Sequence, residues 1–162
     1  MEAKNRTLKL CLDEMGVEAE IGEIENRIRL QKAVYLAQRL GADLGYRFSW
    51  YLRGPYSTNL TADYYSLKEA LNVGDDDSNE FELIDNMKTQ LRRAKELFQV
   101  PQDVELEDEH EWLELLASLD YLIKVSGMDL EGARETLETK KAELAPFTNQ
   151  AFAALRRFNL VG

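Results

Sequence analysis

The chain has 162 residues, of which 44% are hydrophobic and 31% are charged, a composition that argues against both a disordered chain and a membrane protein. Acidic residues outnumber basic ones by 30 to 20, so the net charge is -10 and the average surface repels phosphates. Nucleic acid would therefore need a local basic patch. We expect a single domain over residues 1–162, with a mixed part at 1–71 and a helical part at 80–162.

The first expected elements are a helix and a short strand. Residues 3–15 place Leu8, Leu12 and Met15 on one helical side, and Gly16 ends the run. Residues 17–21 alternate apolar and acidic side chains, which is the two-residue period of a strand.

Residues 23–40 are predicted to form the central helix of the domain. At about 100° per residue this segment carries two apolar rows on different sides, so it must be covered from two directions. The first row is Ile24, Ile28 and Tyr35, the second is Leu30, Val34 and Ala37, and the stripe left to solvent is Glu25, Arg29, Lys32 and Arg39.

Residues 46–53 carry the strongest strand signal. Apolar side chains alternate with polar ones, so that Arg47, Ser49, Tyr51 and Arg53 share the polar face. A lone strand needs a neighbour, and residues 17–21 or 104–106 are the candidates, with Glu18 and Glu20 opposite the arginines in the first case. Gly54-Pro55 then turns the chain, and Ser57 caps a helix that runs to about Leu71.

The remaining chain predicts helices. Apolar residues at helical spacing run from Phe81 to Phe98, from Trp112 to Ile123, from about Asp129, and after Pro146. Acidic runs at 75–82 and 103–114 precede two of these helices, and the pairs with capping-box spacing are Asp77 with Glu80 and Asp108 with Glu111. Helix entry accounts for both runs, and an acidic docking surface is the alternative.

These elements predict a mainly α fold of about seven helices around the central helix, with a small two-stranded β element. The order helix, strand, helix, helix makes the N-terminal part similar to a winged helix. However, a recognition helix and a second wing strand are not evident in the sequence.

Residues for catalysis and metal binding are scarce. Cys11 and His110 are the single cysteine and histidine, and nothing in the sequence brings them together, so Cys11 is expected to be a small buried side chain. His110-Glu111 lacks the second histidine of H-E-x-x-H, and no glycine-rich phosphate loop occurs. Carboxylates are too numerous for any pair to be specific. We expect no enzyme activity, no cofactor and no metal.

The sequence also predicts the compartment. A lone cysteine forms no internal disulfide, and residues 1–16 lack the apolar core of a signal peptide. No window approaches the ~18 apolar residues of a membrane helix. A cytoplasmic protein without membrane contact is expected.

The polar face of residues 46–53 and the turn after it form the candidate binding site. Arginine and tyrosine are enriched in interface hot spots, and the same types bind phosphates and bases. We predict that the partner-binding residues are Arg47, Tyr51, Arg53, Tyr56 and Asn59. An exposed face neutralised by Glu18, Glu20 or a later helix is the structural alternative. Nucleic acid, which the net charge disfavours, would use Arg29, Lys32, Arg39, Arg47 and Arg53.

Two stretches carry a family resemblance. R-L-Q-K-A-V-Y-L at 29–36, followed by F-S-W-Y-L-R-G-P-Y-S at 48–57, resembles the YwgA-type family of small bacterial proteins. It is more distantly similar to the Panacea domain of SocA-like antitoxins. The similarity covers roughly residues 23–67. It implies a mainly helical bacterial protein without a known enzymatic centre and, for the Panacea relatives, binding of a toxin or its delivery to a protease.

The residues that match the motif are Gln31, Lys32, Tyr35, Trp50, Gly54 and Pro55. Panacea members usually show G-P-V with a following proline, whereas Gly54-Pro55-Tyr56-Ser57 is closer to the YwgA pattern. Physically, the aromatic residues indicate packing, Gly54-Pro55 a turn, and Gln31 a side chain that holds this turn. The expected function is a non-catalytic protein-binding module, an antitoxin or adaptor; the alternative is a nucleic-acid-binding regulator.

Overall fold

The computed structural model describes all residues, 1–162, and shows seven α-helices and one small sheet. The helices are α1 (Ala3–Met15), α2 (Ile24–Arg39), α3 (Thr58–Asn72), α4 (Asp85–Leu97), α5 (Glu109–Lys124), α6 (Leu130–Lys140) and α7 (Thr148–Arg157). The strands are β1 (Ser49–Tyr51) and β2 (Gly54–Tyr56), and short 3-10 turns lie at Ser78–Glu80 and Ala145–Phe147. The predicted mainly α fold with a two-stranded β element is confirmed. None of the helices is long and apolar enough to cross a membrane.

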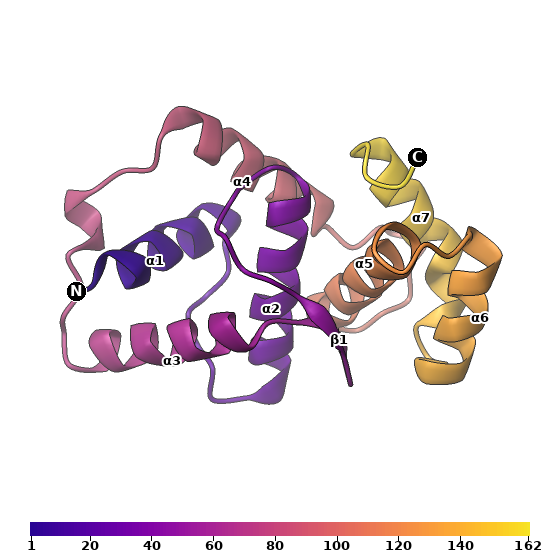
Figure 1. The fold of residues 1–162 in the computed structure, drawn as a ribbon, viewed down its shortest axis with the longest axis horizontal. Coiled ribbons are helices and arrows are strands. Elements are labelled where there is room, and N and C mark those ends of the chain that lie inside the picture. Colours follow the sequence, from indigo (N-terminus) through magenta and orange to yellow (C-terminus); the bar gives the residue numbers. More distant parts are fainter.

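Helix α2 lies between two groups of helices, with α1, α3 and α4 on one side and α5, α6 and α7 on the other (Figure 1). Every residue from Leu30 to Ala37 is buried, which confirms that this helix is covered from more than one direction. A single cluster of 38 buried apolar residues draws on all seven helices, so the two groups share one core. Asp120 attaches α5 to the central helix, because it accepts hydrogen bonds from Tyr35 and Arg39 of α2, each at 2.7 Å.

The β element is a local hairpin. β1 pairs antiparallel with β2, with Trp50 opposite Pro55. The prediction that residues 17–21 or 104–106 supply the neighbour is wrong, since neither segment forms a strand. The prediction that Gly54-Pro55 turns the chain is also wrong: the turn lies at Leu52 and Arg53, and Gly54, at φ 95°, begins β2. Because the chain reverses there, the expected strand is only three residues long. The apolar face of the expected strand also ends early, because Leu52 is 79% exposed.

The expected solvent stripe of α2 is wrong at one position. Glu25 is exposed as predicted, whereas Lys32 is only 1% exposed. Ile24, expected in an apolar row, is instead 46% exposed. The hairpin covers Lys32, and the Lys32 amine donates a hydrogen bond to the Pro55 carbonyl at 2.8 Å.

Two expected helix starts differ in the structure. α4 begins at Asp85 rather than Phe81, because residues before it are held by α1: the Arg6 guanidinium lies over the Phe81 ring, 3.9 Å from its centre. Asp108 precedes α5 but makes no side-chain capping bond. Capping does occur at Ser57, which accepts from Leu60 N at 3.2 Å, and at Asp129.

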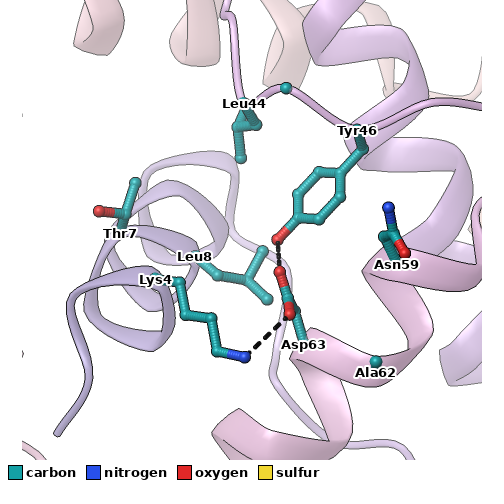
Figure 2. Close-up of a pocket in the computed structure, with 9 residues that line it drawn as sticks. Lys4, Thr7, Leu8, Leu44, Tyr46, Asn59, Ala62 and Asp63 are labelled. Carbon is teal, nitrogen blue, oxygen red and sulfur yellow. Dashed lines mark hydrogen bonds and ion pairs between the residues drawn. The ribbon is translucent and has the colours of Figure 1, made fainter.

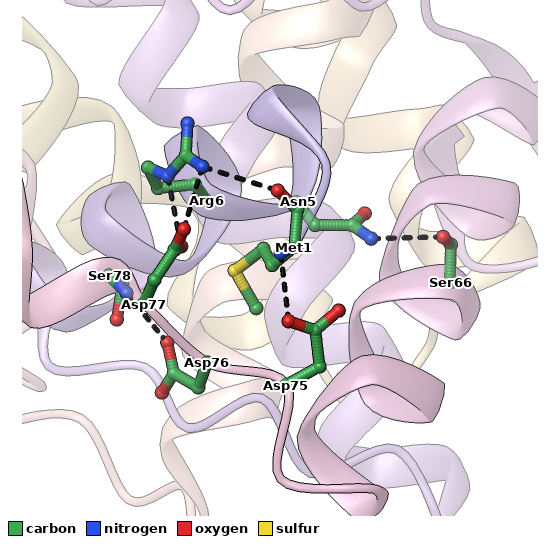
Figure 3. A network of polar contacts seen from close by, with 8 residues as sticks. All are labelled: Met1, Asn5, Arg6, Ser66, Asp75, Asp76, Asp77 and Ser78. Atoms are coloured by element: carbon green, nitrogen blue, oxygen red, sulfur yellow. Dashed lines mark hydrogen bonds and ion pairs between the residues drawn. The ribbon is translucent and has the colours of Figure 1, made fainter.

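The acidic run at 75–82 is partly engaged inside the protein (Figure 3). Asp77 accepts two hydrogen bonds from Arg6, at 3.0 and 2.9 Å, so it does not cap a helix with Glu80 as predicted. Asp75 lies 2.8 Å from the amino group of Met1, and Asp76 accepts from Ser78 N at 2.9 Å. These bonds attach the connection between α3 and α4 to the start of α1.

Candidate functional site

Two polar side chains of α2 hold the hairpin backbone. The amide of Gln31 donates to the Ser57 carbonyl and accepts from the Ser57 N–H, both at 3.0 Å. Lys32 holds the carbonyl of Pro55. A two-stranded hairpin has few backbone hydrogen bonds of its own, so these side chains satisfy groups that a larger sheet would pair. Gln31 was predicted to hold the turn; its bonds instead fix Ser57, at the end of β2 away from the turn.

The other side of the hairpin rests on α5 and on the end of α6. The Gly54 backbone packs against Ser118, and Lys141 forms an ion pair with Glu114 at 3.2 Å, with both side chains less than a tenth exposed. The Lys141 amine also lies 3.4 Å from the Leu52 carbonyl. The tip of the hairpin is therefore clamped from two helical layers.

Aromatic packing supports the same arrangement. The Trp50 ring lies 5.7 Å from Tyr121 of α5, and Phe48 meets Tyr35 edge to face at 5.3 Å. Trp50 and Tyr35 thus have the packing role that their sequence pattern indicates.

A groove of about 340 Å³ lies between this hairpin, α2 and α3. Its apolar and aromatic walls are formed by Ile24, Ile28, Tyr51, Tyr56, Tyr64 and Tyr65. The rings of Tyr51 and Tyr56 lie 5.3 Å apart, and those of Tyr64 and Tyr65 lie 5.2 Å apart. The groove has the size and mixed lining of a binding site for a side chain or small group.

The five predicted partner-binding residues do not all lie together. Tyr51, Arg53 and Tyr56 line the groove, Arg47 is exposed before β1 and outside the groove, and Asn59 lines a different cavity. Neither arginine forms an ion pair or a side-chain hydrogen bond. Glu20 pairs with Lys68 at 3.0 Å and Glu18 forms no ion pair, so the alternative, in which these acids neutralise the arginines, does not hold.

The sequence analysis missed several groove and clamp residues. Tyr64 and Tyr65 were not singled out, nor were Glu114, Ser118 and Lys141, which are distant in the sequence and follow no pattern that points to the hairpin. One usable signal was present: residues 44–62 contain no acidic residue in an otherwise acidic chain.

A second cavity, of about 500 Å³, lies between α1, α3 and the segment before β1 (Figure 2). The Tyr46 hydroxyl donates to Asp63 at 2.7 Å, and the Lys4 amine lies 3.4 Å from the same carboxylate. Burial and Asp63 raise the pKa of Tyr46, so the phenol keeps its proton. Because its one acid and one lysine pair with each other, this cavity offers little free charge to a ligand.

The two single residues considered for catalysis lie on different helices, Cys11 in α1 and His110 in α5. Cys11 is fully buried, as predicted, and burial raises its thiol pKa to about 12. Its reactive thiolate is therefore scarce at neutral pH. Asp108, His110 and Glu111 offer ligand atoms within 4.8 Å of one another at the surface. Three such groups at an open helix start do not by themselves define a metal site.

Lys32 is the most perturbed cation of the site. Desolvation lowers the pKa of its amine from 10.5 to about 7; Glu114 opposes this change, whereas Lys141 and Arg53 add to it. Between these two pH values Lys32 binds more protons in the unfolded chain than in the folded one, so this group makes the free energy of unfolding rise with pH in this window.

A Lys32→Met variant should lose this pH dependence. We expect the free energy of unfolding of the wild type, minus that of the variant, to increase between pH 7 and 10, at up to ~1.4 kcal/mol per pH unit. Urea denaturation across this range measures it, and the subtraction cancels the titration of other groups. Lys124→Met, which changes an exposed lysine, is the control and should give a curve parallel to the wild type. A parallel curve for Lys32→Met would show that Lys32 is not desolvated.

No protein-family model, curated protein or solved structure matches the chain. The resemblance of residues 23–67 to the YwgA-type and Panacea families therefore stays an expectation from the sequence.

Proposed function

We propose that the protein is a non-catalytic binding module that captures another protein with the hairpin tip and the groove beside it. The observation that carries this proposal is the unpaired Arg53 next to Tyr51 and Leu52, which are 58% and 79% exposed on a backbone that buried side chains hold in place. Rigid presentation lowers the entropy lost on binding, and arginine and tyrosine are typical anchors of protein interfaces.

The class of the partner is inferred only from the family resemblance. A role as antitoxin or adaptor, with a toxin or protease as the partner, rests on the resemblance of the motif at 29–36 and 48–57. The groove is compatible with this role because its lining residues, 24 to 65, all lie within the segment that carries the resemblance.

The nucleic-acid alternative has less support. Of its five expected phosphate contacts, Lys32 is buried, Arg29 lies 3.7 Å from Glu109, and Arg39 pairs with Asp120. Arg47 and Arg53 alone remain free, and two cations are few for a chain of net charge -10 to hold a polyanion.

A double variant tests the proposal. Arg53→Glu with Tyr51→Ala should abolish partner capture, because it removes the anchor side chains, while the thermal unfolding midpoint stays almost unchanged. Quantitative affinity purification from the native cell, comparing the wild type with the variant, measures capture. A protein that the wild type and Arg47→Glu retain and the double variant loses is the predicted result. A large drop in the midpoint would show that these residues are structural, and retardation of DNA or RNA at ~50 mM salt would favour the alternative.

A further inference from the structure

The groove has a charge opposite to that of the rest of the protein. Its lining includes Arg27, Lys32 and Arg53, and no acidic side chain. The chain as a whole carries 30 acidic residues and a net charge of -10, so this local reversal is not expected from composition. A cationic site that stands among acidic surroundings attracts an anionic group over a short range only.

The two arginines keep donors for a ligand. Arg53 makes no hydrogen bond or ion pair, and Arg27 uses one nitrogen, which donates to the Ile21 carbonyl at 2.8 Å. Lys32, which is only 1% exposed, lies behind them and donates to the carbonyl of Pro55. Arginine forks in particular bind carboxylates through two parallel hydrogen bonds.

The walls around these cations are apolar and aromatic. Exposed side chains continue the groove onto the surface, since Ile24 is 46% and Tyr65 48% exposed, beside Leu52 at the hairpin tip. A ligand that fills the site must therefore offer an apolar side chain next to its acid. A phosphate backbone presents regularly repeated charge and does not match an apolar rim around so few cations.

We infer that the groove binds a short acidic segment of the partner protein, in which an aspartate or glutamate adjoins an aromatic or aliphatic side chain. The carboxylate meets Arg53 and Arg27, with Lys32 behind them, and the apolar side chain packs among the tyrosines. This inference rests on the proposed function and specifies the chemistry of the partner.

Selection from a library of short random peptides tests the inference. The full chain is immobilised, bound peptides are sequenced, and the affinity of a selected peptide is measured by fluorescence anisotropy. We expect enrichment of Asp or Glu next to an aromatic or aliphatic residue, with binding that weakens as salt rises. Arg53→Glu should lower the affinity at least about tenfold.

Arg47→Glu is the matched control, because it makes the same charge change at an exposed arginine that precedes β1 and does not line the groove. It should leave the affinity within about twofold of the wild type, since surface charges at a distance are screened. Equal losses in both arginine variants would overturn the inference, because net charge rather than the groove would then explain binding. Thermal unfolding of each variant confirms that it is folded.

The outcomes separate this inference from the proposed function. Enriched peptides that are neutral or basic, and whose binding still requires Tyr51, would overturn the acidic specificity and leave a protein-binding groove. Absence of any peptide that depends on Tyr51 or Arg53 would contradict both. Displacement of the peptide by a single-stranded oligonucleotide at ~150 mM salt would also overturn the inference. So would a dimer that Arg53→Glu dissociates, since a second copy of the chain would then occupy the groove.

Discussion

Gly54→Ala is expected to destabilise the protein by about 2–5 kcal/mol. Gly54 has a φ of 95°, which side chains with a Cβ rarely adopt, and an added Cβ would lie well inside 3.0 Å of the Ser118 hydroxyl oxygen. Part of the loss is backbone strain and part is the steric conflict with α5. The free energy of unfolding from urea denaturation measures both together.

Two further variants separate these contributions. Gly74→Ala has a similar φ of 74° with no atom within 4 Å of the added Cβ, so it should lose only the backbone part, about 1 kcal/mol. Ser118→Ala removes the conflicting oxygen, which has no hydrogen-bond partner, and should restore part of the stability in the Gly54→Ala background. If Gly54→Ala lost no more than Gly74→Ala, the hairpin would not pack on α5 as described.

Glu114→Gln is expected to destabilise the protein by about 3–5 kcal/mol. The substitution keeps the shape of the side chain but leaves the Lys141 ammonium buried without its counter-charge. The Glu114 carboxylate also favours the charged form of the nearby Lys32 amine, and this attraction is lost as well. A buried unpaired charge costs much more than the pair itself contributes. The measurement is again urea denaturation at neutral pH.

A matched control is Glu109→Gln, which removes a carboxylate that is 45% exposed and pairs loosely with Arg29 at 3.7 Å. This loss should stay below about 1 kcal/mol. Adding Lys141→Met to Glu114→Gln should recover much of the stability, because no buried charge then lacks a partner. Additive losses in the double variant would show that the two groups do not interact.

Local signals account for the elements that the sequence predicts well. Gly16 adopts φ 70° and ends α1 as expected, and Ser57 caps α3. These positions work because a helix end is decided by the conformation or hydrogen bond of one residue nearby. The central position of α2 was likewise readable from its two apolar rows, since periodicity reports which sides are buried.

The buried polar contacts of the hairpin could not be predicted, because they depend on residues far away in the sequence. Whether Lys32 is buried depends on the hairpin and on α5, and its partner is a backbone carbonyl that has no sequence signature. Similarly, Phe81 continues the apolar spacing of α4, but Arg6 of α1, 75 residues earlier in the chain, lies over its ring and outside that helix. Of the candidate site, the residue types at Tyr51, Arg53 and Tyr56 were predictable, whereas the groove they line requires α3 in its place.

The central claim is that the hairpin tip and its groove contact another protein. A photo-reactive amino acid at Leu52, expressed in the native cell, tests it most directly, with Val73, which is 80% exposed at the end of α3, as the reference position. We predict a specific protein cross-link from position 52 that is absent from position 73 and is lost when Arg53→Glu and Tyr51→Ala are added. Cross-links of equal yield from both positions, or a cross-link at position 52 that survives these substitutions, would contradict the claim.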